Sequence, residues 1–372
     1  MLTGGVPPRI PRLHGLTVVR GHGNERCMKA ALIREHGGPE VIRVEEVPTP
    51  QPGPGEVLVR VKAAALNHLD LWVRRGLPGG HFPLPNVGGG DVSGELVACG
   101  PGVSFSEEMP EASPVMVIPT LSCGLCERCQ QGADPLCPQF GVLGETRWGG
   151  LAEFLVVPRT NVVAKPPNLS FEQAAAVPLT FLTAWHMLVG RARVQFGETV
   201  LVQAAGSGVS TAAIQIAKHL GATVITTASR REKLEAATRL GADHVVDYRQ
   251  QDIVAEVREL THGRGVDVVV EHVGGETFER STRCLGWGGR LVTCGATTGH
   301  KVNLNLRHLF FKGQSILGST MGSKAEFHEL MKPLAAGKLR AVIDRVIGLD
   351  AVGEAHRALE HREVFGKVVV VP

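Results

Sequence analysis

The sequence predicts an α/β protein of two domains, a β-rich domain followed by a doubly wound parallel sheet. The chain has 372 residues, enough for about two domains of ordinary size. Its composition, 43% hydrophobic and 20% charged, is typical of a globular protein. The pattern changes near residue 170, where short apolar runs between glycines and prolines give way to alternating strand-like and helix-like segments.

Residues 1–27 do not look like part of a fold. They contain three prolines between positions 7 and 11, no acidic residue before Glu25, and no apolar stretch of signal-peptide length. We expect a disordered N-terminal extension, with the fold beginning at Met28. A transit peptide is a second interpretation because the segment is rich in arginine, although it lacks a serine-rich amphipathic pattern.

Residues 28–170 are expected to form a mainly antiparallel β domain. The apolar runs at 29–33, 56–61 and 93–98 are short and are bounded by glycines and prolines. Such runs are typical of strands with one buried face.

Residues 171–315 are expected to form the parallel sheet. Strands are predicted at residues 199–203, 223–227, 244–246, 266–270 and 290–294. Segments with helical spacing separate them, at residues 209–220, 231–240, 252–260 and 277–285. Repeated βα units of this kind imply a doubly wound sheet. We expect residues 316–372, with two further helices and two further strands, to return to the first domain.

The charge balance excludes two classes of partner. With 39 Lys and Arg against 36 Asp and Glu, the net charge is only +3, and no basic run is dense enough to follow a phosphate backbone. The most apolar stretch, residues 174–189, is interrupted by Pro178 and His186 and is shorter than the roughly 20 residues of a bilayer span. We therefore expect no nucleic acid and no membrane, but a small-molecule substrate.

Half of the cysteines form one cluster, whose members are Cys123, Cys126, Cys129 and Cys137. Four thiolates on one short loop are typical of a closed tetrahedral zinc site, with no open position for substrate. The site is therefore predicted to be structural, with one zinc ion per chain, in a reducing compartment such as the cytoplasm. An iron–sulfur cluster is the main alternative.

A glycine-containing turn predicts dinucleotide binding. It follows the predicted strand at 199–203 and opens the next helix, and its candidate contacts are Ala205, Gly206, Ser207, Gly208 and Val209. Small residues there let the backbone approach a pyrophosphate, which the N–H groups at the helix N-terminus attract. Ala205 and Ser210 stand where glycines are common, but both are small enough to keep the turn.

The end of the second predicted strand favours NADPH over NADH. An enzyme that uses NAD places a carboxylate there on the ribose hydroxyls. This chain instead has Ser229, Arg230 and Arg231, which are suited to a 2′-phosphate. The alternative is that both arginines are solvated residues at a helix start.

The cysteine loop and the turn at 204–210, followed by Gln215, resemble the medium-chain dehydrogenase/reductase family. Within it, the chain from Met28 to Pro372 is similar to zinc-type alcohol dehydrogenases and quinone oxidoreductases. The resemblance implies a GroES-like catalytic domain that the C-terminal segment completes, and a Rossmann domain. It further implies an active site between the two domains, and a homodimer or homotetramer.

The resemblance also implies further coenzyme contacts. Lys233 and Tyr248 match positions that contribute to NADPH binding in quinone oxidoreductase relatives, although Tyr248 is also readable as an ordinary residue at a strand end. The remaining candidates lie at the carboxyl ends of parallel strands or at the domain edge, and are Val273, Gly274, Gly295, Ala296 and Lys367.

The family's catalytic zinc is not expected here. Zinc alcohol dehydrogenases take its ligands from a Cys, a His and a Cys or Asp, and the matching positions in this chain are Asn67, Gly90 and Leu179. An unorthodox metal site is an alternative, which would be built from His68, His81 and His186 with Asp70 or Asp91.

Loss of that metal narrows the expected reaction. A catalytic zinc stabilises the alkoxide of a simple carbonyl by several kcal/mol, whereas a conjugated acceptor spreads the charge itself. We expect an NADPH-dependent oxidoreductase of quinones or α,β-unsaturated carbonyls, with Asn67 as the hydrogen-bond donor to the acceptor and Asp70 ordering the loop. The alternatives are a zinc-type alcohol dehydrogenase and a non-catalytic, coenzyme-binding redox sensor.

Overall fold

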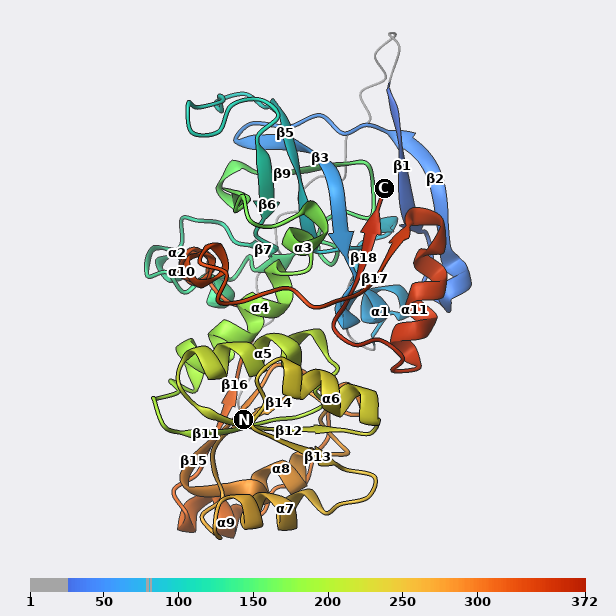
Figure 1. The fold of residues 1–372 in the computed structure, drawn as a ribbon. Coiled ribbons are helices and arrows are strands. Elements are labelled where there is room, and N and C mark those ends of the chain that lie inside the picture. The colour runs from blue at the N-terminus through green and yellow to red at the C-terminus, as the bar shows by residue number, and fades with distance from the viewer. Residues whose placement is uncertain (1–25, 78–79, 81) are drawn as a thin grey trace, which may run out of the picture.

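The structure is a computed structural model that describes residues 26–77, 80 and 82–372. Two lobes are visible, one made by both ends of the chain and one by its middle (Figure 1). Of the expected extension at residues 1–27, residues 1–25 lie outside the described residues. Cys27 already pairs with Pro48 as the first residue of a strand, one residue before the expected start of the fold.

The first domain is built on antiparallel strands, as expected. A seven-stranded sheet has the order β10-β6-β5-β3-β18-β17, with β9 also paired to β3. These strands are β3 (Glu56–Ala65), β5 (Asp91–Cys99), β6 (Pro114–Val117), β9 (Phe154–Pro158), β10 (Val162–Ala164), β17 (Ile343–Gly348) and β18 (Lys367–Val371). Alternate residues of β3, namely Val57, Val59 and Val61, are buried, and each contributes about 1.5–3 kcal/mol by leaving water.

Smaller elements complete this domain. They are β1 (Cys27–Ile33), β2 (Ile42–Pro48), β4 (Asn86–Val87), β7 (Thr120–Leu121), β8 (Gly141–Val142), α1 (His68–Arg75), α2 (Glu127–Gln130), α3 (Phe171–Ala175), α10 (Lys324–Ala335) and α11 (Val352–Glu360). Short 3-10 turns lie at Pro39–Val41, Asp134–Leu136, Arg159–Asn161 and Leu349–Ala351. Helix α3 packs against β3 and β5, so the chain leaves this domain after α3 rather than at residue 170.

The second domain is a six-stranded parallel sheet of order β13-β12-β11-β14-β15-β16. Its strands are β11 (Thr199–Val202), β12 (Thr223–Ala228), β13 (His244–Asp247), β14 (Val266–Glu271), β15 (Leu285–Thr293) and β16 (Ser315–Gly318). Its helices are α4 (Pro178–Trp185), a π-helical turn at His186–Arg191, α5 (Gly208–His219), α6 (Arg231–Arg239), α7 (Ile253–Leu260), α8 (Phe278–Cys284) and α9 (Leu306–Phe311). The α/β fold with a Rossmann-type sheet is thus confirmed.

Alternation along the central strand explains why helices cover both faces of this sheet. Val200 and Val202 pack into the cluster that contains α5, while Leu201 packs into the cluster of α7 and α8. In Figure 1, α5 lies above the strands and α7 and α8 lie below them. Both faces are therefore buried, as parallel sheets require.

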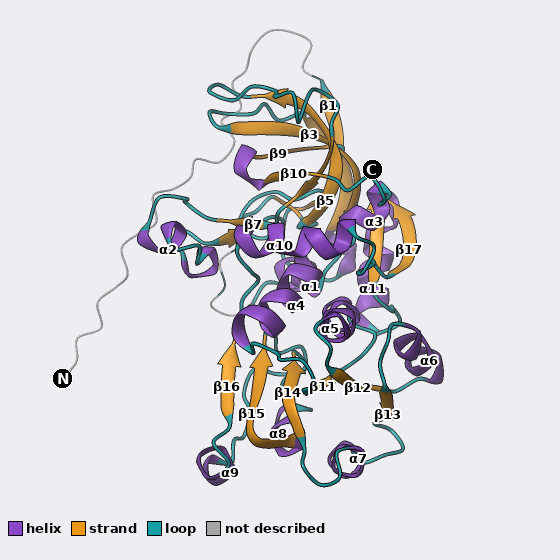
Figure 2. Ribbon diagram, turned by 60° about the vertical axis from the view of Figure 1, so that its left-hand side comes forward, coloured by secondary structure: helices purple, strands orange, loops and turns teal. Residues whose placement is uncertain are grey.

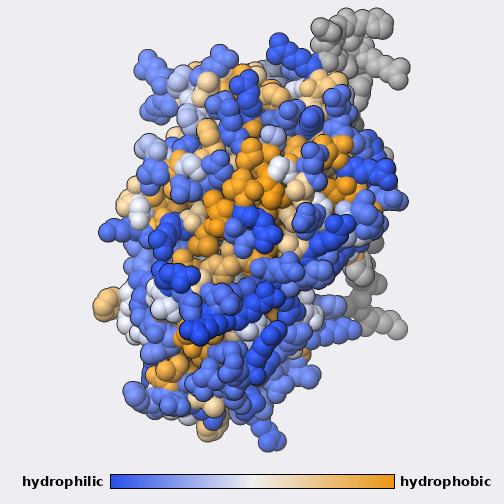
Figure 3. Space-filling view, turned by 45° about the vertical axis from the view of Figure 1, so that its right-hand side comes forward, coloured by the Kyte–Doolittle hydropathy of each residue, from blue (hydrophilic) through white to orange (hydrophobic). Residues whose placement is uncertain are grey.

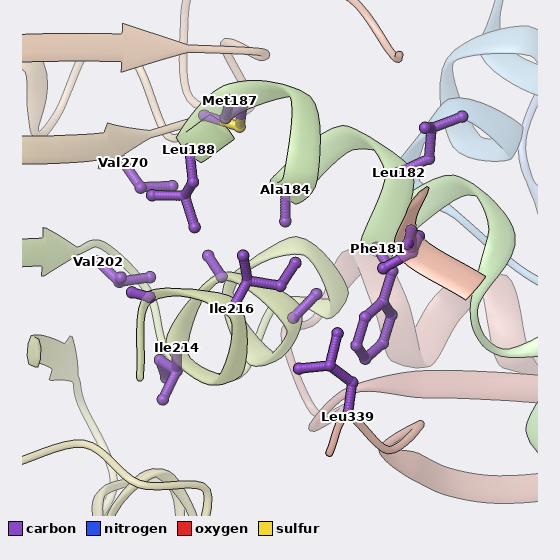
Figure 4. Close-up of a cluster of buried hydrophobic side chains, with 14 of the residues drawn as sticks. Phe181, Leu182, Ala184, Met187, Leu188, Val202, Ile214, Ile216, Val270 and Leu339 are labelled. Atoms are coloured by element: carbon purple, nitrogen blue, oxygen red, sulfur yellow. The ribbon is translucent and has the colours of Figure 1, made fainter. Parts of the chain in front are cut away.

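Helix α4 and the π-helical turn after it connect the domains through an apolar contact with α5. Figure 4 shows Ala184 and Leu188 directed at Ile216, with Phe181 and Leu339 beside them. All five side chains are at most 1% exposed. The stretch that is most apolar in the sequence is therefore core, and within the described residues no helix is both long enough and apolar enough to span a bilayer.

The C-terminal segment returns to the first domain after supplying the sixth strand of the second. Strand β16 pairs with β15 as far as Gly318, so the return begins after residue 318 rather than at 316. Helix α10 packs on α4, and β18 enters the first sheet beside β3. The arrowheads of β14, β15 and β16 point towards this domain (Figure 2), which places the carboxyl ends of the parallel strands at the junction. Most of the face in Figure 3 is hydrophilic, with apolar residues gathered mainly over its middle and upper parts.

A buried arginine ties α1 to α11. Arg74 is 1% exposed, forms a salt bridge with Glu360, and donates to Nδ1 of His356 at 3.3 Å and to the carbonyl oxygen of Gly37 at 3.1 Å. Since a guanidinium only donates, His356 must accept as a neutral ring. Burial, followed by the charge of Arg74, lowers the pKa of His356 to about 3.

Stability is predicted to fall in acid through His356. In the unfolded chain the pKa is near 6.5, so this stabilisation is complete above pH 6.5 and is lost progressively as the pH falls towards 3, by about 3 kcal/mol at pH 4. The variant His356→Gln keeps an acceptor for Arg74 but does not titrate. Urea unfolding between pH 4 and 7 should show a smaller pH slope for this variant. Equal slopes in the two proteins would contradict the assignment.

Candidate active site

One cavity of about 550 Å³ lies at the junction, and both domains line it. The predicted site residues that line it are Asn67, Ala205, Gly206, Ser207, Gly208, Val209, Ser229, Lys233, Tyr248, Val273, Gly295 and Lys367. Five other predicted residues are not among those that line it, namely Asp70, Arg230, Arg231, Gly274 and Ala296. The structure therefore brings most of the predicted coenzyme contacts and the predicted catalytic amide to one place.

The glycine-containing turn forms a tight cradle at the start of α5. Ser207 is the residue before the helix, and the N–H of Ala205 donates to the carbonyl oxygen of Thr227 at 2.8 Å. A Cβ on Gly208 would lie 2.9 Å from Thr180 and 3.0 Å from Lys367. A larger residue at this position would therefore have to displace the side chain of Thr180 or Lys367. The cradle leaves open backbone N–H groups at a helix N-terminus, which suits a pyrophosphate.

The residues after β12 take different directions. Ser229 lines the cavity, whereas the side chain of Arg231 is 86% exposed and pairs with Glu235 at 2.8 Å. Lys233 donates to the carbonyl oxygens of Arg362 and Val364, at 2.8 and 2.9 Å. Burial lowers the pKa of Lys233, with the charge of Arg230 as the second cause. Lys233 thus links the edge of the second domain to the C-terminal segment.

A buried ion pair occupies the centre of the junction. Nζ of Lys367 donates to Oδ2 of Asp91 at 2.7 Å and to Oδ1 of Asn67 at 2.5 Å. The amide nitrogen of Asn67 donates to the same Oδ2 at 2.9 Å. Asn67, Asp91 and Lys367 are 7%, 0% and 3% exposed. Since lysine only donates and a carboxylate only accepts, these contacts determine which way the amide of Asn67 points.

Asp70 orders the loop beneath this cluster. Its carboxylate accepts from the N–H groups of Asn67 and Gly89, both at 2.7 Å. Burial raises the pKa of Asp70 to about 6, and the two backbone donors oppose that rise. Asp70 is not among the residues that line the cavity. Its geometry therefore fits the predicted role of ordering the loop rather than contact with substrate.

The positions that match the family's catalytic-zinc ligands cannot hold that ion. Leu179 has no donor atom in its side chain, and its backbone N–H donates to Asp91 at 2.5 Å. A side chain at Gly90 has no room, because a Cβ would lie 2.6 Å from the carbonyl oxygen of Leu143. Asn67 is already bonded to Asp91 and Lys367. The residues present therefore do not fit a catalytic zinc of the family type.

Among the described residues, neither His68 nor His186 belongs to a group close enough to hold a metal. His186 bonds to Glu326 at 2.8 Å, and His81 lies outside the described residues. His68 lines the cavity, and burial lowers its pKa to about 4. Across the described residues, the only group of three or more His, Cys, Asp or Glu side chains close enough to hold a metal is the cysteine cluster.

That cluster fits a single tetrahedral ion. The sulfur atoms of Cys123, Cys126, Cys129 and Cys137 all lie within 4.8 Å of one another, and four of the separations are 3.6–3.9 Å. A zinc ion with Zn–S bonds of about 2.3 Å needs sulfur atoms about 3.8 Å apart. Backbone N–H groups of Leu125 and Cys126 lower the pKa of Cys123 to about 6, which favours the thiolate that a metal binds.

Two polar residues at the end of β14 were not predicted as site residues. Glu271 is 0% exposed and accepts from the N–H groups of Val273 and Gly274, at 2.7 and 3.1 Å. His272 lines the cavity and bonds to Ser210 at 2.8 Å. The available signal was their position, since polar residues at the carboxyl end of a parallel strand commonly serve a binding site.

Metal analysis should find one zinc ion per chain. The variant Cys129→Ser should lose it and unfold at a lower temperature, because a bound structural zinc stabilises such a loop by about 10 kcal/mol in apparent terms. Cys99→Ser, which changes a cysteine outside the cluster, is the matched control and should keep the metal. Iron with visible absorbance would favour an iron–sulfur site, and unchanged zinc in Cys129→Ser would contradict the ligand set.

Comparison with known proteins agrees with this geometry. Residues 53–167 match the alcohol dehydrogenase GroES-like domain, and residues 208–336 match the zinc-binding dehydrogenase family. A solved NAD-dependent alcohol dehydrogenase is 51% identical, with a TM-score of 0.89, covering 93% of this chain and 100% of its own.

Three curated relatives bear different names. An NAD-dependent alcohol dehydrogenase of Sulfolobus acidocaldarius is 32% identical, covering 92% of this chain and 99% of its own. A quinone oxidoreductase of Pseudomonas aeruginosa is 32% identical, with coverages of 91% and 97%. A crotonyl-CoA reductase of Streptomyces collinus is 30% identical, with coverages of 94% and 87%. With these matches over nearly the full length, and with the coenzyme cradle and cysteine cluster in place, the chain belongs to the medium-chain dehydrogenase/reductase family as an NAD(P)-dependent oxidoreductase of the zinc-type alcohol dehydrogenase and quinone oxidoreductase group.

Proposed function

We propose that this protein reduces quinones or α,β-unsaturated carbonyls with NADPH and without a catalytic zinc. The observation that supports the proposal is the hydrogen-bonded cluster of Asn67, Asp91 and Lys367, because the resemblance matches Asn67 to a ligand of the catalytic zinc. The donor set there contains no thiolate and no imidazole, so it supports hydrogen bonding rather than metal binding.

The acceptor class follows from the charge that reduction creates. Hydride addition to an isolated carbonyl concentrates a full negative charge on one oxygen, which a metal ion stabilises by several kcal/mol. Addition to a quinone or an enone spreads that charge over a conjugated system. Hydrogen-bond donors in a buried pocket then suffice, and the amide of Asn67 lines the cavity with one N–H that Asp91 does not use.

The coenzyme preference rests on Ser229 and Arg230. No carboxylate stands at the end of β12 to repel a 2′-phosphate, and Ser229 lines the cavity. Arg231 supports the preference less, because it pairs with Glu235 on the surface. Tyr248, which lines the cavity, is a further proposed NADPH contact, while Gly274 and Ala296, which are not among the lining residues, remain proposed contacts on sequence grounds.

An alcohol dehydrogenase is the second candidate, and the names of the relatives favour it. The solved structure that is 51% identical is called an NAD-dependent alcohol dehydrogenase, whereas the quinone oxidoreductase and the crotonyl-CoA reductase are 32% and 30% identical. The crotonyl-CoA relative is named for an α,β-unsaturated thioester, which agrees with the first candidate. A coenzyme-binding sensor without turnover is the third.

We further propose a cytoplasmic homodimer or homotetramer. Strand β16 is an edge of the parallel sheet, and large apolar side chains are exposed on β15 and α9 nearby. Trp287 is 70% exposed and packs on Phe311 with ring centres 5.7 Å apart, and Phe310 is 72% exposed. A second copy would cover these side chains.

Substrate profiling tests the function. The protein should reduce a quinone or an enone with NADPH and should oxidise simple alcohols slowly. The variant Asn67→Ala should lower kcat for the enone about 100-fold, as loss of one oxyanion donor does, with little change in NADPH affinity. Fast alcohol oxidation that depends on a second bound zinc would favour the second candidate, and coenzyme binding without any turnover would favour the third.

Replacement of Arg230 and Arg231 by Ala tests the proposed preference for NADPH over NADH. Because a hydrogen bond to a charged group contributes about 1.5–3 kcal/mol, the Michaelis constant for NADPH should rise at least about tenfold while that for NADH changes little. Arg239→Ala, at the other end of α6, is the matched control. Equal effects on the two coenzymes would contradict the assignment.

A further inference from the structure

Lys367 has a different environment from the one the sequence predicts for a coenzyme contact. Its Cδ lies 3.0 Å from the position of a Cβ on Gly208, so the side chain passes along the coenzyme cradle, and its Nζ ends on Asn67 and Asp91. Two of the three ammonium hydrogens are thus engaged. Among the described residues no acceptor is found for the third, and Lys367 lines the cavity.

The two partners of the ion pair differ in their relation to the cavity. Asp91 is fully buried and is not one of the residues that line the cavity, whereas Lys367 and Asn67 both are. The acceptor capacity of Asp91 is used by Leu179 through Oδ1 and by Asn67 and Lys367 through Oδ2. The carboxylate therefore compensates the buried ammonium from a position outside the cavity lining.

We propose that Lys367 is a catalytic residue whose ammonium stabilises the oxyanion formed on the acceptor during hydride transfer. This inference rests on the proposed function and deepens it, because it names the positive charge that acts where relatives place a metal. Asn67 and Lys367 then form a two-donor oxyanion site, in which Asp91 is a positioning residue.

The step balances without a metal and without a protein acid. A reduced nicotinamide bound in the cradle would supply a hydride, which is two electrons and one proton, for the β-carbon of the enone. The C=C electron pair moves to form an enolate, whose oxygen accepts hydrogen bonds from Lys367 and Asn67. Lys367 keeps its proton throughout, and water protonates the α-carbon afterwards. The products are the saturated carbonyl, the oxidised coenzyme and the hydroxide left by the water.

If Lys367 were instead a coenzyme contact, its replacement would have a different kinetic effect. A lysine that binds the pyrophosphate acts on affinity, so its loss raises the dissociation constant for NADPH. A lysine that binds the developing oxyanion acts on the rate of the bound complex. Single-turnover kinetics at saturating NADPH separate the two roles, and fluorescence titration of NADPH gives the affinity.

The test uses Lys367→Met, which keeps the length and removes the charge, and Lys367→Arg, which keeps the charge. Because Lys367→Met leaves Asp91 buried without its partner, the double variant Lys367→Met with Asp91→Asn is included, and thermal unfolding verifies that each protein is folded. The probes are but-3-en-2-one as enone and 1,4-benzoquinone as quinone.

We expect the rate with the enone to fall at least 100-fold in Lys367→Met and in the double variant, with a dissociation constant for NADPH within about threefold of wild type. Lys367→Arg should recover part of the rate. The loss should be smaller with the quinone, because the quinone spreads the charge further.

Two results would overturn the proposed role of Lys367 and leave the proposed function standing. One is a wild-type rate in folded Lys367→Met at saturating NADPH, and the other is a loss confined to NADPH affinity. If wild type reduces neither probe but oxidises alcohols, the proposed acceptor class is wrong, and the same variants then test Lys367 on the alkoxide. A wild-type protein that turns over neither class overturns both proposals.

Discussion

The junction depends on one constraint, which is that a buried ammonium needs a buried carboxylate. Lys367 and Asp91 meet at 2.7 Å with 3% and 0% of their side chains exposed. Removing either partner from such a pair costs about 3–5 kcal/mol, since the other charge is left uncompensated. The pair requires the C-terminal strand β18 to lie in the first sheet, near β5. The return of the chain across the domain boundary is therefore what builds the site.

The cysteine cluster and the positions that match the family's catalytic-zinc ligands differ in what they require of the fold. The cysteine cluster is formed by one short loop, which supplies all four sulfur atoms without help from any other element. The second position needs ligands from three separate elements, and here Gly90 is closed by the carbonyl oxygen of Leu143 while Leu179 offers only a backbone N–H. In the proposed function, hydrogen bonds from Asn67 and Lys367 act in place of a metal ion, and their weaker electrophilic power limits the reaction to conjugated acceptors.

Features that depend on neighbours in sequence were predictable, and features that depend on distant contacts were not. The cysteine spacing, the turn before α5 and the alternation of strands and helices are local patterns, and the structure forms each of them. The contacts of Lys367 with Asn67 and Asp91 could not be predicted, because they join residues that lie 300 and 276 positions apart in the sequence. Sequence position alone therefore suggested only a coenzyme contact for Lys367. The pairing of Arg231 with Glu235 on the surface was not predictable, because a partner four residues away gives no information about where either side chain points.

The central claim is that an ammonium, not a metal ion, faces the acceptor. Crystals of the protein with bound coenzyme, measured at the zinc absorption edge, test it most directly. The account predicts one anomalous peak per chain, centred among Cys123, Cys126, Cys129 and Cys137, and none beside Asn67 and Asp91. A second peak in contact with Asn67 or Asp91, next to the nicotinamide, would contradict it.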